Sequence, residues 1–422
     1  MKIKLIYKGD FGENLRGPEM RYLCVARSLT DMGHEVTIKA NKISEKHLED
    51  GIHFSPIRFT DEIKNLFNKN KYQDCTIIHG GGPWILLNAL VAGFFGKKII
   101  LDNYVPHWIE LDEEATHTRN SPRLLIKSSF NALRALLGSL VFDALIVANQ
   151  RQLDLARGFS SPFSRTEGFD RVHIIPFGCE PYQNYSRSRG IELLNQLMQS
   201  NEKLKPSDFL VGWIGGTYGW FDLTTLLEHL MPAIQSNANI KLVFFGAGKE
   251  KQNEMLDALP TELHGNIIFL PWVPFAQRFE HWSAFDLSLV WGSRGYENDY
   301  ASRTRNFDCL TLGLPILQNE DDEWGARLKS SGAGRVTDTE RLADDLLRLS
   351  HDPETLRSMK GKMRELAPEF HWDRFADKLL DVAARPTMSF GRRLSGLLTF
   401  LLLIPSALVM FTYSLFSTCT KK

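Results

Sequence analysis

The chain has 422 residues, of which 43% are apolar and 24% are charged, and its 50 lysines and arginines balance its 50 aspartates and glutamates. This length exceeds one ordinary hydrophobic core, so we expect two folded domains. Proteins that bind nucleic acid carry a basic surplus, so the neutral balance argues against such a partner. Five scattered cysteines without a C-x-x-C pair exclude a disulfide framework and a cysteine zinc site, and favour a reducing compartment.

The first half of the chain alternates short apolar runs with helical patterns. Residues 3–8 predict a strand, residues 9–17 form a glycine-bearing loop, and Pro18 opens a helix that Gly33 ends. A second strand at residues 34–38 completes a strand–helix–strand unit, which predicts a parallel sheet. Further strands are predicted at residues 76–79, 98–102, 144–148 and 172–176.

The pattern restarts after a polar stretch at residues 180–207, which predicts a linker with a short helix. A strand at residues 209–214 leads into the turn Gly215-Gly216-Thr217, and Asp222 caps the helix that follows. Later strands are predicted at residues 241–245, 266–270, 287–291 and 315–318. The sequence therefore predicts an α/β protein of two Rossmann-like, doubly wound halves facing a cleft, with ligands outside the carboxyl ends of the strands.

The C-terminal region contains a long uncharged run at residues 394–416. A helix of this length, rising about 1.5 Å per residue, crosses a hydrocarbon core of roughly 30 Å. Arg392 and Arg393 precede the run and place that flank on the cytoplasmic side, and Pro405 interrupts it. The start at Met1 resembles a strand and not a secretory signal. We expect a membrane span or a kinked in-plane anchor, with both globular halves on the cytoplasmic side; the alternative is a buried core helix.

A second candidate membrane contact lies at residues 121–140, where apolar positions alternate with Arg123, Lys127 and Arg134. A basic amphipathic helix can lie on an anionic membrane surface. The alternative is a core-packed helix with solvated charges, and the sequence does not separate the two.

Two common nucleotide motifs are absent from the chain. Gly246-Ala247-Gly248 begins a dinucleotide fingerprint, but Lys251 stands where its third glycine belongs. No G-x-x-x-x-G-K-[ST] segment occurs, which excludes a P-loop NTPase. Residues 320–323 are acidic but typical of a solvated loop, and no H-x-H or D-x-D pattern suggests a metal.

Residues 286–317 carry the strongest candidate site. A strand leads to a polar loop with Arg294, Glu297 and Asp299, then to a helix that should start near Tyr300 to Arg303. A helix start offers backbone N–H groups to an anion. We expect Arg303 and Arg305 to bind phosphates and Asp308 to accept from ribose hydroxyls. The alternative is a solvated arginine pair.

Several segments in order resemble the retaining glycosyltransferases of GT-B fold, specifically glycosyltransferase family 4. They are GPEMRYLCVARSLTDMGHEVTI, FDALIVAN, VHIIPFGCE, KLVFFGAG, NIIFLPWVPFAQRFEHWSAFDLSLVWGSRGYEN and DCLTLGLPIL, and the likeness covers most of residues 1–385. The resemblance implies an acceptor-binding domain at residues 1–185 and a nucleotide-sugar-binding domain at residues 206–370. It also implies a helix at residues 371–385 that crosses back to the first domain, and metal-independent chemistry without a cofactor.

The chain departs from the family at two places. The family carries two glutamates eight positions apart; the second falls on Asp308, and the first falls on Tyr300, so Glu297 or Asp299 is expected to substitute. The family's arginine and lysine after the first strand of the second half are missing from GGTYGWFDL, where Gly216 and Thr217 are expected to contact the donor. Stabilising the leaving charge is usually the largest catalytic contribution, so we expect Arg303 and Arg305 to neutralise the diphosphate.

The first half supplies two further candidates. Gly17 lies in the loop that such enzymes bring against the phosphates and donor sugar, although an ordinary turn would explain it equally well. His107 falls where the family places a cleft histidine, and together with Glu297 it is the candidate catalytic residue. A structural histidine is the alternative.

The expected activity is that of a hexosyltransferase-type enzyme acting on a nucleotide diphosphate sugar, with retention and with a lipid-linked or other membrane-associated glycan as acceptor. The rival is a catalytically weak, membrane-anchored subunit that binds nucleotide sugars or glycans within an assembly complex. A sugar-nucleotide epimerase of the same fold is the third possibility.

Overall fold

The computed structural model describes residues 1–12, 15–44, 51–58, 61, 72–79, 83–117, 121–160, 170–199, 202–218, 221–292, 295–319 and 323–419. The side chains of residues 83, 116–117, 159–160 and 406–419 fall outside that description. The chain divides into two compact units, which are described separately. Unit 1 comprises Met1–Phe177 and Trp372–Lys422, and unit 2 comprises Gly178–His371.

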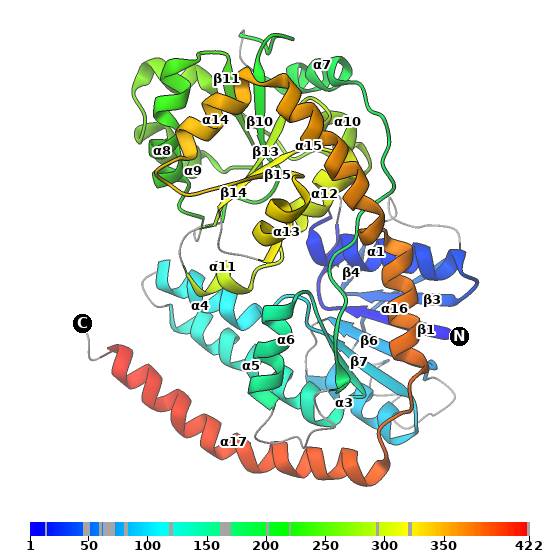
Figure 1. Ribbon diagram of the computed structural model, residues 1–422. Helices are drawn as coiled ribbons and strands as arrows, with labels where there is room; N and C mark the ends of the chain where they lie inside the picture. Colours follow the sequence, from blue (N-terminus) through cyan, green and yellow to red (C-terminus); the bar gives the residue numbers. More distant parts are fainter. Residues whose placement is uncertain are drawn as a thin grey trace. The chain divides into compact units, whose positions relative to one another are not determined.

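Unit 1 is built on a parallel sheet in the order β5-β3-β1-β6-β7-β8-β9 (Figure 1). Its strands are β1 (Lys2–Tyr7), β3 (Glu35–Ala40), β5 (Ile52–Pro56), β6 (Cys75–His79), β7 (Lys98–Asp102), β8 (Ala144–Val147) and β9 (Val172–Ile174). The short strands β2 (Asp10–Phe11) and β4 (Lys42–Ile43) pair beside it. The strands β6, β7 and β8 are fully buried, as expected of a parallel sheet covered on both faces.

The helices of unit 1 follow the strands in the alternating order that the apolar patterns predict. They are α1 (Gly17–Asp31), α3 (Pro83–Phe94), α4 (His107–His117), α5 (Pro122–Val141), α6 (Gln150–Ser160), α16 (Trp372–Ala384) and α17 (Phe390–Cys419). The helix α16 packs against α1, where the Ser28 hydroxyl donates to Asp373 at 2.8 Å. The residues that follow unit 2 in the chain thus belong to the core of unit 1.

Unit 2 contains a second parallel sheet in the order β12-β11-β10-β13-β14-β15. Its strands are β10 (Phe209–Trp213), β11 (Ile240–Phe245), β12 (Ile267–Leu270), β13 (Leu287–Val290), β14 (Ile316–Asn319) and β15 (Gly334–Thr337). In both units the sheet order reverses after the first strand, between β1 and β6 and between β10 and β13. The predicted doubly wound α/β halves are therefore confirmed, and each reversal is a switch point where such sheets bind ligands.

Nine helices are described in unit 2. They are α7 (Arg187–Leu197), α8 (Leu223–Ser236), α9 (Lys249–Asp257), α10 (Arg278–Trp282), α11 (Tyr296–Tyr300), α12 (Thr304–Leu312), α13 (Glu323–Ser331), α14 (Leu342–His351) and α15 (Pro353–Leu366). The leucine stripe of α8 is buried against β10 and β11 together with Trp213 and Phe244. Asp222 caps α8 as predicted, because its carboxylate accepts from the Thr225 N–H.

Some boundaries differ from the sequence prediction. The first unit ends at Phe177, whereas the sequence placed its end at residue 185. The short helix predicted within residues 180–207 is present as α7, which packs on α10 within unit 2. The single helix expected to start near Tyr300 is two helices, because Ala301 has an extended backbone and α12 begins only after Arg303. Strands β5 and β15 escaped prediction because both are short and only partly buried.

The helix α17 runs without a break from Phe390 to Cys419, along the lower side of unit 1 in Figure 1. Its first half packs on α5 and on the unit 1 core through Leu397, Phe400 and Leu403. The two helices approach closely at Gly396, where an added Cβ would lie 2.3 Å from the Leu140 carbonyl oxygen. A glycine is required there for contact between the helix backbones.

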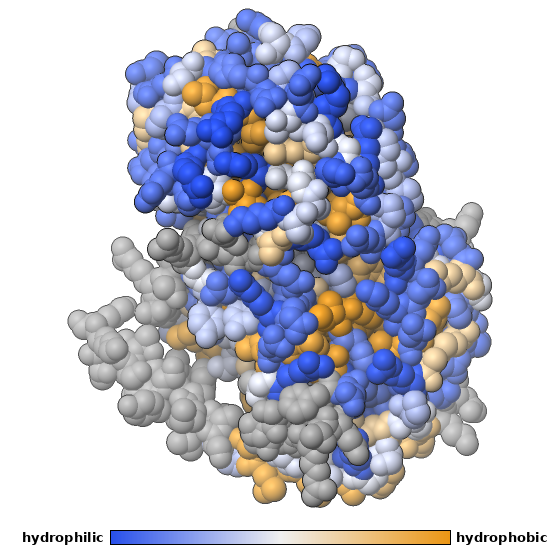
Figure 2. Space-filling view, in the orientation of Figure 1, coloured by the Kyte–Doolittle hydropathy of each residue, from blue (hydrophilic) through white to orange (hydrophobic). Residues whose placement is uncertain are grey.

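Other apolar side chains of α17 face away from the core. Phe390, Leu394, Leu398, Leu401 and Leu402 are exposed, Leu402 to 77%. Figure 2 shows apolar side chains along the same lower side, where Figure 1 draws α17. The second half of the predicted anchor at residues 394–416 lies outside the residues whose side chains are described. Among the described residues, only α5 is long and apolar enough to cross a membrane, a property that it shares with core helices.

The helix α5 has features of both a membrane-surface helix and a core-packed helix, the two alternatives for residues 121–140. Ile126 and Phe130 are exposed, Phe130 to 68%, whereas the C-terminal part of the helix is buried. Arg123 and Lys127 are exposed, but Arg134 is partly buried and desolvation lowers its pKa to about 10. The helix therefore has a core-packed end and an exposed basic, apolar end.

Candidate functional site

The switch point of unit 2 lies where β10 and β13 end. Trp213 closes β10 and is buried, and its indole N–H donates to the Gly216 carbonyl at 3.0 Å. This bond fixes the turn that leaves the strand, with Gly216 and the partly exposed Thr217 in it. Among the described residues, Asp222 is the only non-glycine residue with a left-handed backbone, at φ 44°. Such strained positions concentrate at functional sites.

Arg305 lies on α12 with its guanidinium stacked 4.2 Å from the Trp213 ring centroid and 4.9 Å from that of Phe221. The side chain is buried, and its Nη1 donates to no acceptor within the part of the chain that the structure describes. Burial, and then the neighbouring Arg303 charge, lower the pKa of Arg305 to about 9, so it stays protonated at pH 7. A buried cation without a carboxylate is costly unless an anion completes the site.

Arg303 has a different environment from Arg305. Its guanidinium forms a bidentate pair with Glu297 at 2.6 and 2.7 Å and also donates to Asn298 Oδ1 at 3.1 Å. Both charged side chains are buried, at 8% and 6% exposure. The Arg303 charge is therefore already paired, whereas Arg305 forms no ion pair within the described part of the chain. Arg294, also named in the sequence motif, lies outside the described residues.

Asp308 is buried on α12 beside Arg278, a residue that the sequence analysis missed. Arg278 Nε donates to Asp308 Oδ1 at 3.3 Å, and Arg278 Nη2 donates to Glu180 at 3.0 Å. Desolvation raises the pKa of Asp308 to about 6, opposed by Arg278. In this structure the predicted ribose-binding carboxylate belongs to an arginine-centred cluster. Residues 180, 278 and 308 meet only through the fold, so no local sequence pattern identifies the cluster.

Gly215 allows a close approach of the β10 turn to Arg305. A Cβ added there would lie 2.7 Å from Arg305 Nη2, closer than real Cβ contacts. We predict that Gly215→Ala displaces the guanidinium from Trp213 and weakens the binding of nucleoside diphosphates by about tenfold, the cost of one charge-assisted hydrogen bond. Calorimetric titration with a panel of nucleoside diphosphates measures this affinity.

The matched control is Gly361→Ala on α15, where an added Cβ meets nothing within 4 Å. This variant should bind the same nucleotides as the unchanged protein. Equal affinities of the Gly215→Ala and Gly361→Ala proteins would contradict a role for Arg305 in the site.

The switch point of unit 1 lies between the ends of β1 and β6, where Tyr7 stacks on His79 with ring centroids 6.0 Å apart. His79 is buried, and burial and the neighbouring His107 lower its pKa well below the usual range. His79 Nδ1 donates to the Asp102 carbonyl at 3.0 Å, which leaves Nε2 to accept from His107 Nε2 at 3.3 Å. His107 Nδ1 lies 3.1 Å from Glu110.

A continuous chain of contacts thus runs from the Asp102 carbonyl through His79 and His107 to Glu110. The His107 side chain is 31% exposed, so a ligand can reach it. The predicted catalytic residue His107 thus lies at the start of α4, at the ligand-binding edge of its sheet.

Arg21 organises the same edge of unit 1. Its guanidinium pairs with Asp102 at 2.9 Å and donates to the carbonyls of Ile175 and Pro176, and it stacks on Tyr104. These contacts tie α1 to the carboxyl ends of β7 and β9. Gly17, the other predicted residue of unit 1, is the first residue of α1.

The structure gathers the predicted residues into two groups. Glu297, Arg303, Arg305 and Asp308 share the region around α11 and α12 in unit 2, and His107 and Gly17 lie in unit 1. Sequence reasoning missed the aromatic platform of Trp213 and Phe221 under Arg305. No group of three or more metal-ligating side chains occurs among the described residues, and residues 320–322 of the acidic run fall outside them.

No family model matches the chain, and no curated protein matches it in sequence. Solved structures share its fold over 90% of its length. WaaG, a glycosyltransferase involved in lipopolysaccharide biosynthesis, has 14% identity and a TM-score of 0.64 over 99% of its own chain. Anabaena HepE, solved with UDP-glucose, has 13% identity and a TM-score of 0.63 over 98% of its chain.

The same fold occurs in another class of enzyme. A putative UDP-N-acetylglucosamine 2-epimerase from Listeria monocytogenes has 11% identity and a TM-score of 0.51, with 90% of this chain and 94% of that chain covered. At these identities the likeness establishes the α/β fold of GT-B glycosyltransferases. It leaves the reaction and the substrates to be argued from the site itself.

Proposed function

We propose that the chain is a glycosyltransferase that transfers a hexosyl group from a nucleotide diphosphate sugar, with retention, to a membrane-associated acceptor such as a lipid-linked glycan. The observation that carries the proposal is Arg305, a buried guanidinium at the switch point of unit 2 that forms no ion pair with a carboxylate of the described residues. A diphosphate leaving group supplies the missing negative charge, and that charge grows as the sugar–phosphate bond breaks.

The neighbouring residues have distinct roles in this proposal. The Arg303–Glu297 pair holds α11 against the start of α12 and places the Glu297 carboxylate near the donor sugar. The N–H groups at the start of α12 add positive potential for phosphate. Asp308 accepts hydrogen bonds from the ribose hydroxyls, which replace part of its contact with Arg278. His107 contacts the acceptor at the carboxyl ends of the unit 1 strands, and neither metal nor cofactor takes part.

The test of transfer uses the full chain in detergent micelles with a panel of nucleotide sugars and membrane extract as the source of acceptor. Release of nucleoside diphosphate, together with incorporation of labelled sugar into lipid, is the expected result. Transfer requires the acceptor and hydrolysis does not, so release of nucleoside diphosphate only in the presence of membrane extract identifies transfer. Binding of a nucleotide sugar without release under any condition would instead support the rival assembly subunit.

An epimerase is the second alternative because the fold is shared with the Listeria protein. An epimerase would change the stereochemistry of the sugar in the absence of any acceptor. Nuclear magnetic resonance of the nucleotide sugar after incubation with the protein detects this change. The exposed apolar residues of α17 favour a membrane-associated acceptor over this alternative, since an epimerase acts on a soluble substrate.

The membrane proposal rests on α17 being apolar on every side. Leu397 and Leu403 pack on unit 1, while Leu398 and Leu402 are exposed. A helix that is apolar all round requires a hydrocarbon environment or burial in protein. The exposed Phe130 of α5 adds a second apolar contact, with the cations Arg123 and Lys127 to face anionic headgroups. The catalytic units then lie on the cytoplasmic side.

Truncating the chain within α17 tests whether this helix is the membrane anchor, and chains ending at different residues should behave differently. A chain ending at Pro405 keeps the packed residues Leu397, Phe400 and Leu403, so it should leave the membrane fraction while its free energy of unfolding stays unchanged. A chain ending at Arg393 loses that packing and should aggregate, because it exposes the unit 1 core. Sedimentation of cell extracts distinguishes the two. A Pro405-terminated chain that still sediments with membranes would place the anchor elsewhere.

A further inference from the structure

The side chain of Arg134 on α5 reaches the ligand-binding edge of unit 1. The helix leads into the amino end of β8, so it runs antiparallel to that strand, and helical side chains tilt toward the start of their own helix. Arg134 therefore extends toward the carboxyl ends of the strands, where His79 lies. Burial lowers the pKa of His79, and the Arg134 charge lowers it further. The same charge opposes the rise that burial causes in the pKa of Tyr22, so the guanidinium is close to both rings.

The charge of Arg134 is unpaired among the residues that the structure describes. Within this part of the chain Arg134 forms no ion pair, and its buried Nε donates to no acceptor. Desolvation lowers its pKa to about 10, so the guanidinium stays charged at pH 7. The residue is only partly buried, so a ligand can reach it. A desolvated cation of this kind is stabilised when an anion binds beside it.

The Tyr22 hydroxyl is a second unsatisfied donor at this edge. Tyr22 is 2% exposed, and its hydroxyl has no hydrogen-bond partner in the described part of the chain. A buried tyrosine hydroxyl normally has such a partner. The Tyr22 ring packs edge-on against His79 with centroids 6.1 Å apart, and His79 in turn contacts the accessible His107. Arg134 and Tyr22 thus place two unsatisfied donors around His79, beside His107.

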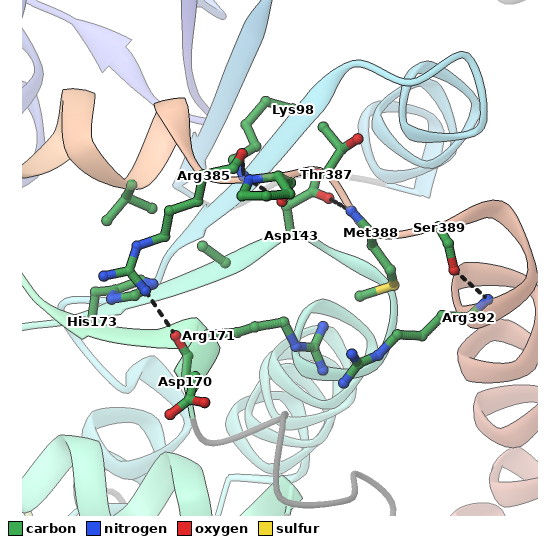
Figure 3. Close-up of a pocket in the computed structure, with 13 residues that line it drawn as sticks. Lys98, Asp143, Asp170, Arg171, His173, Arg385, Thr387, Met388, Ser389 and Arg392 are labelled. Atoms are coloured by element: carbon green, nitrogen blue, oxygen red, sulfur yellow. Dashed lines mark hydrogen bonds between the residues drawn. The ribbon is translucent and has the colours of Figure 1, made fainter.

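Basic residues at the opposite edge of the same sheet are engaged by the protein itself. In the pocket at the amino ends of β7, β8 and β9, Lys98 donates to the Arg385 carbonyl at 2.7 Å, and Arg385 donates to the Asp170 carbonyl at 3.3 Å (Figure 3). These contacts hold the chain between α16 and α17 against the sheet. Arg134 makes no such contact within the described residues, so its donors are available to a ligand.

We infer that the acceptor carries a singly charged oxyanion that binds between Arg134, Tyr22 and His107. The inference rests on the proposed function only in naming the ligand of unit 1 as the acceptor. A planar guanidinium pairs with two oxygens of a carboxylate or of a phosphodiester, and the Tyr22 hydroxyl donates a further hydrogen bond. The single unpaired charge of Arg134 matches the single negative charge of either group.

Two features of an acceptor supply such a group, namely the carboxylate of an acidic sugar and a phosphodiester link. Each has a neutral counterpart of similar shape, which isolates the effect of the charge. Methyl glucuronide is therefore compared with methyl glucoside, and dimethyl phosphate is compared with trimethyl phosphate. The first pair tests for an acidic sugar and the second for a phosphodiester.

Binding is measured on the full chain in detergent micelles, without a donor, so that the result does not require transfer. Saturation-transfer nuclear magnetic resonance follows titration with each probe at constant ionic strength. We expect the charged member of one pair to bind about tenfold more tightly than its neutral counterpart, the effect of one charge-assisted hydrogen bond. No difference within either pair would overturn the inference, even if the protein transfers sugar. A charge-selective response would support it, even if no nucleoside diphosphate is released.

The variants remove each donor separately. Arg134→Met removes the charge and keeps an unbranched apolar stem, and Tyr22→Phe removes only the hydroxyl, so it tests the site if Arg134→Met does not fold. Each should weaken binding of the charged probe about tenfold and leave the neutral probe unaffected. The matched control Arg357→Met removes an exposed arginine of α15 in unit 2 and should change neither. Charge-selective binding that survives both Arg134→Met and Tyr22→Phe, or that Arg357→Met weakens equally, would overturn the inference.

Discussion

Replacing Arg305 by methionine should lower the turnover of a nucleotide sugar by about two to three orders of magnitude, the cost of removing one preorganised charge from a leaving group. The guanidinium is held against Trp213 and Phe221 with Nη1 unsatisfied, so it needs no rearrangement to meet the diphosphate. Methionine keeps the contact with both rings and removes the charge. Initial rates at saturating donor, with calorimetric binding of the nucleoside diphosphate, measure the two effects separately.

The same substitution should leave the free energy of unfolding unchanged or raise it. Burial lowers the pKa of Arg305 from its usual value to about 9 in the folded protein, so folding disfavours its charged form. This penalty is complete below pH 9 and is relieved as the pH rises from about 9 toward the unfolded value, where the unfolded chain binds more protons. The unchanged protein should therefore gain stability relative to Arg305→Met across that window.

Arg303→Met is the matched control for the Arg305 variant. It leaves the Glu297 carboxylate buried without its partner and should cost about 3–5 kcal/mol of stability at pH 7. Urea unfolding of both variants at pH 7 and pH 10 tests the contrast. An Arg305→Met protein with full turnover, or one destabilised as strongly as Arg303→Met, would show that Arg305 has a structural role.

The architecture was predictable from the sequence because buried parallel strands leave a clear apolar signal. Strand β10 is a continuous run without a polar side chain, and β7 has the apolar centre Ile99–Leu101. Every residue of both strands is buried, and the sequence located both to within one residue. Strand β15 contains Gly334 and Arg335 and is mostly half-buried, so its composition resembles a loop. The break between α11 and α12 depends on the backbone at Ala301, where no glycine or proline marks the boundary.

The site was predictable only in part, because charge compensation depends on contacts between distant segments. The spacing of Arg303 and Arg305 suggests two equivalent phosphate ligands, yet Glu297 forms its bidentate ion pair with Arg303. Arg305 is distinguished by Trp213 and Phe221, which arrive from the end of β10 and the turn after it. Likewise Asp308 on α12 forms an ion pair with Arg278 on α10. The sequence identifies the charged residues, whereas the three-dimensional contacts determine which of them form ion pairs within the protein and which can bind a ligand.

Arg393→Met should lower the free energy of unfolding by about 3–5 kcal/mol, because it removes the guanidinium that pairs with the fully buried Asp143 carboxylate. Asp143 also accepts from the backbone N–H groups of Ile99 at 2.7 Å and Met388 at 2.6 Å, so one side chain joins β7, the residues before α17 and α17 itself. The sequence analysis assigned Arg393 to the membrane flank. The structure makes it the buried connection between α17 and unit 1.

A double-mutant cycle separates this pair from general packing. Asp143→Asn alone leaves Arg393 buried and uncompensated, so each single variant should be strongly destabilised, while the double variant should lose less than their sum by up to about 3 kcal/mol. Loss of the connection should also expose residues 385–393, so trypsin should cut after Arg392 faster in each single variant. Additive losses with unchanged proteolysis would mean that the apolar contacts of Leu397, Phe400 and Leu403 hold α17 in place without the ion pair. The expected coupling would instead make the Asp143–Arg393 pair the connection that fixes α17 to unit 1.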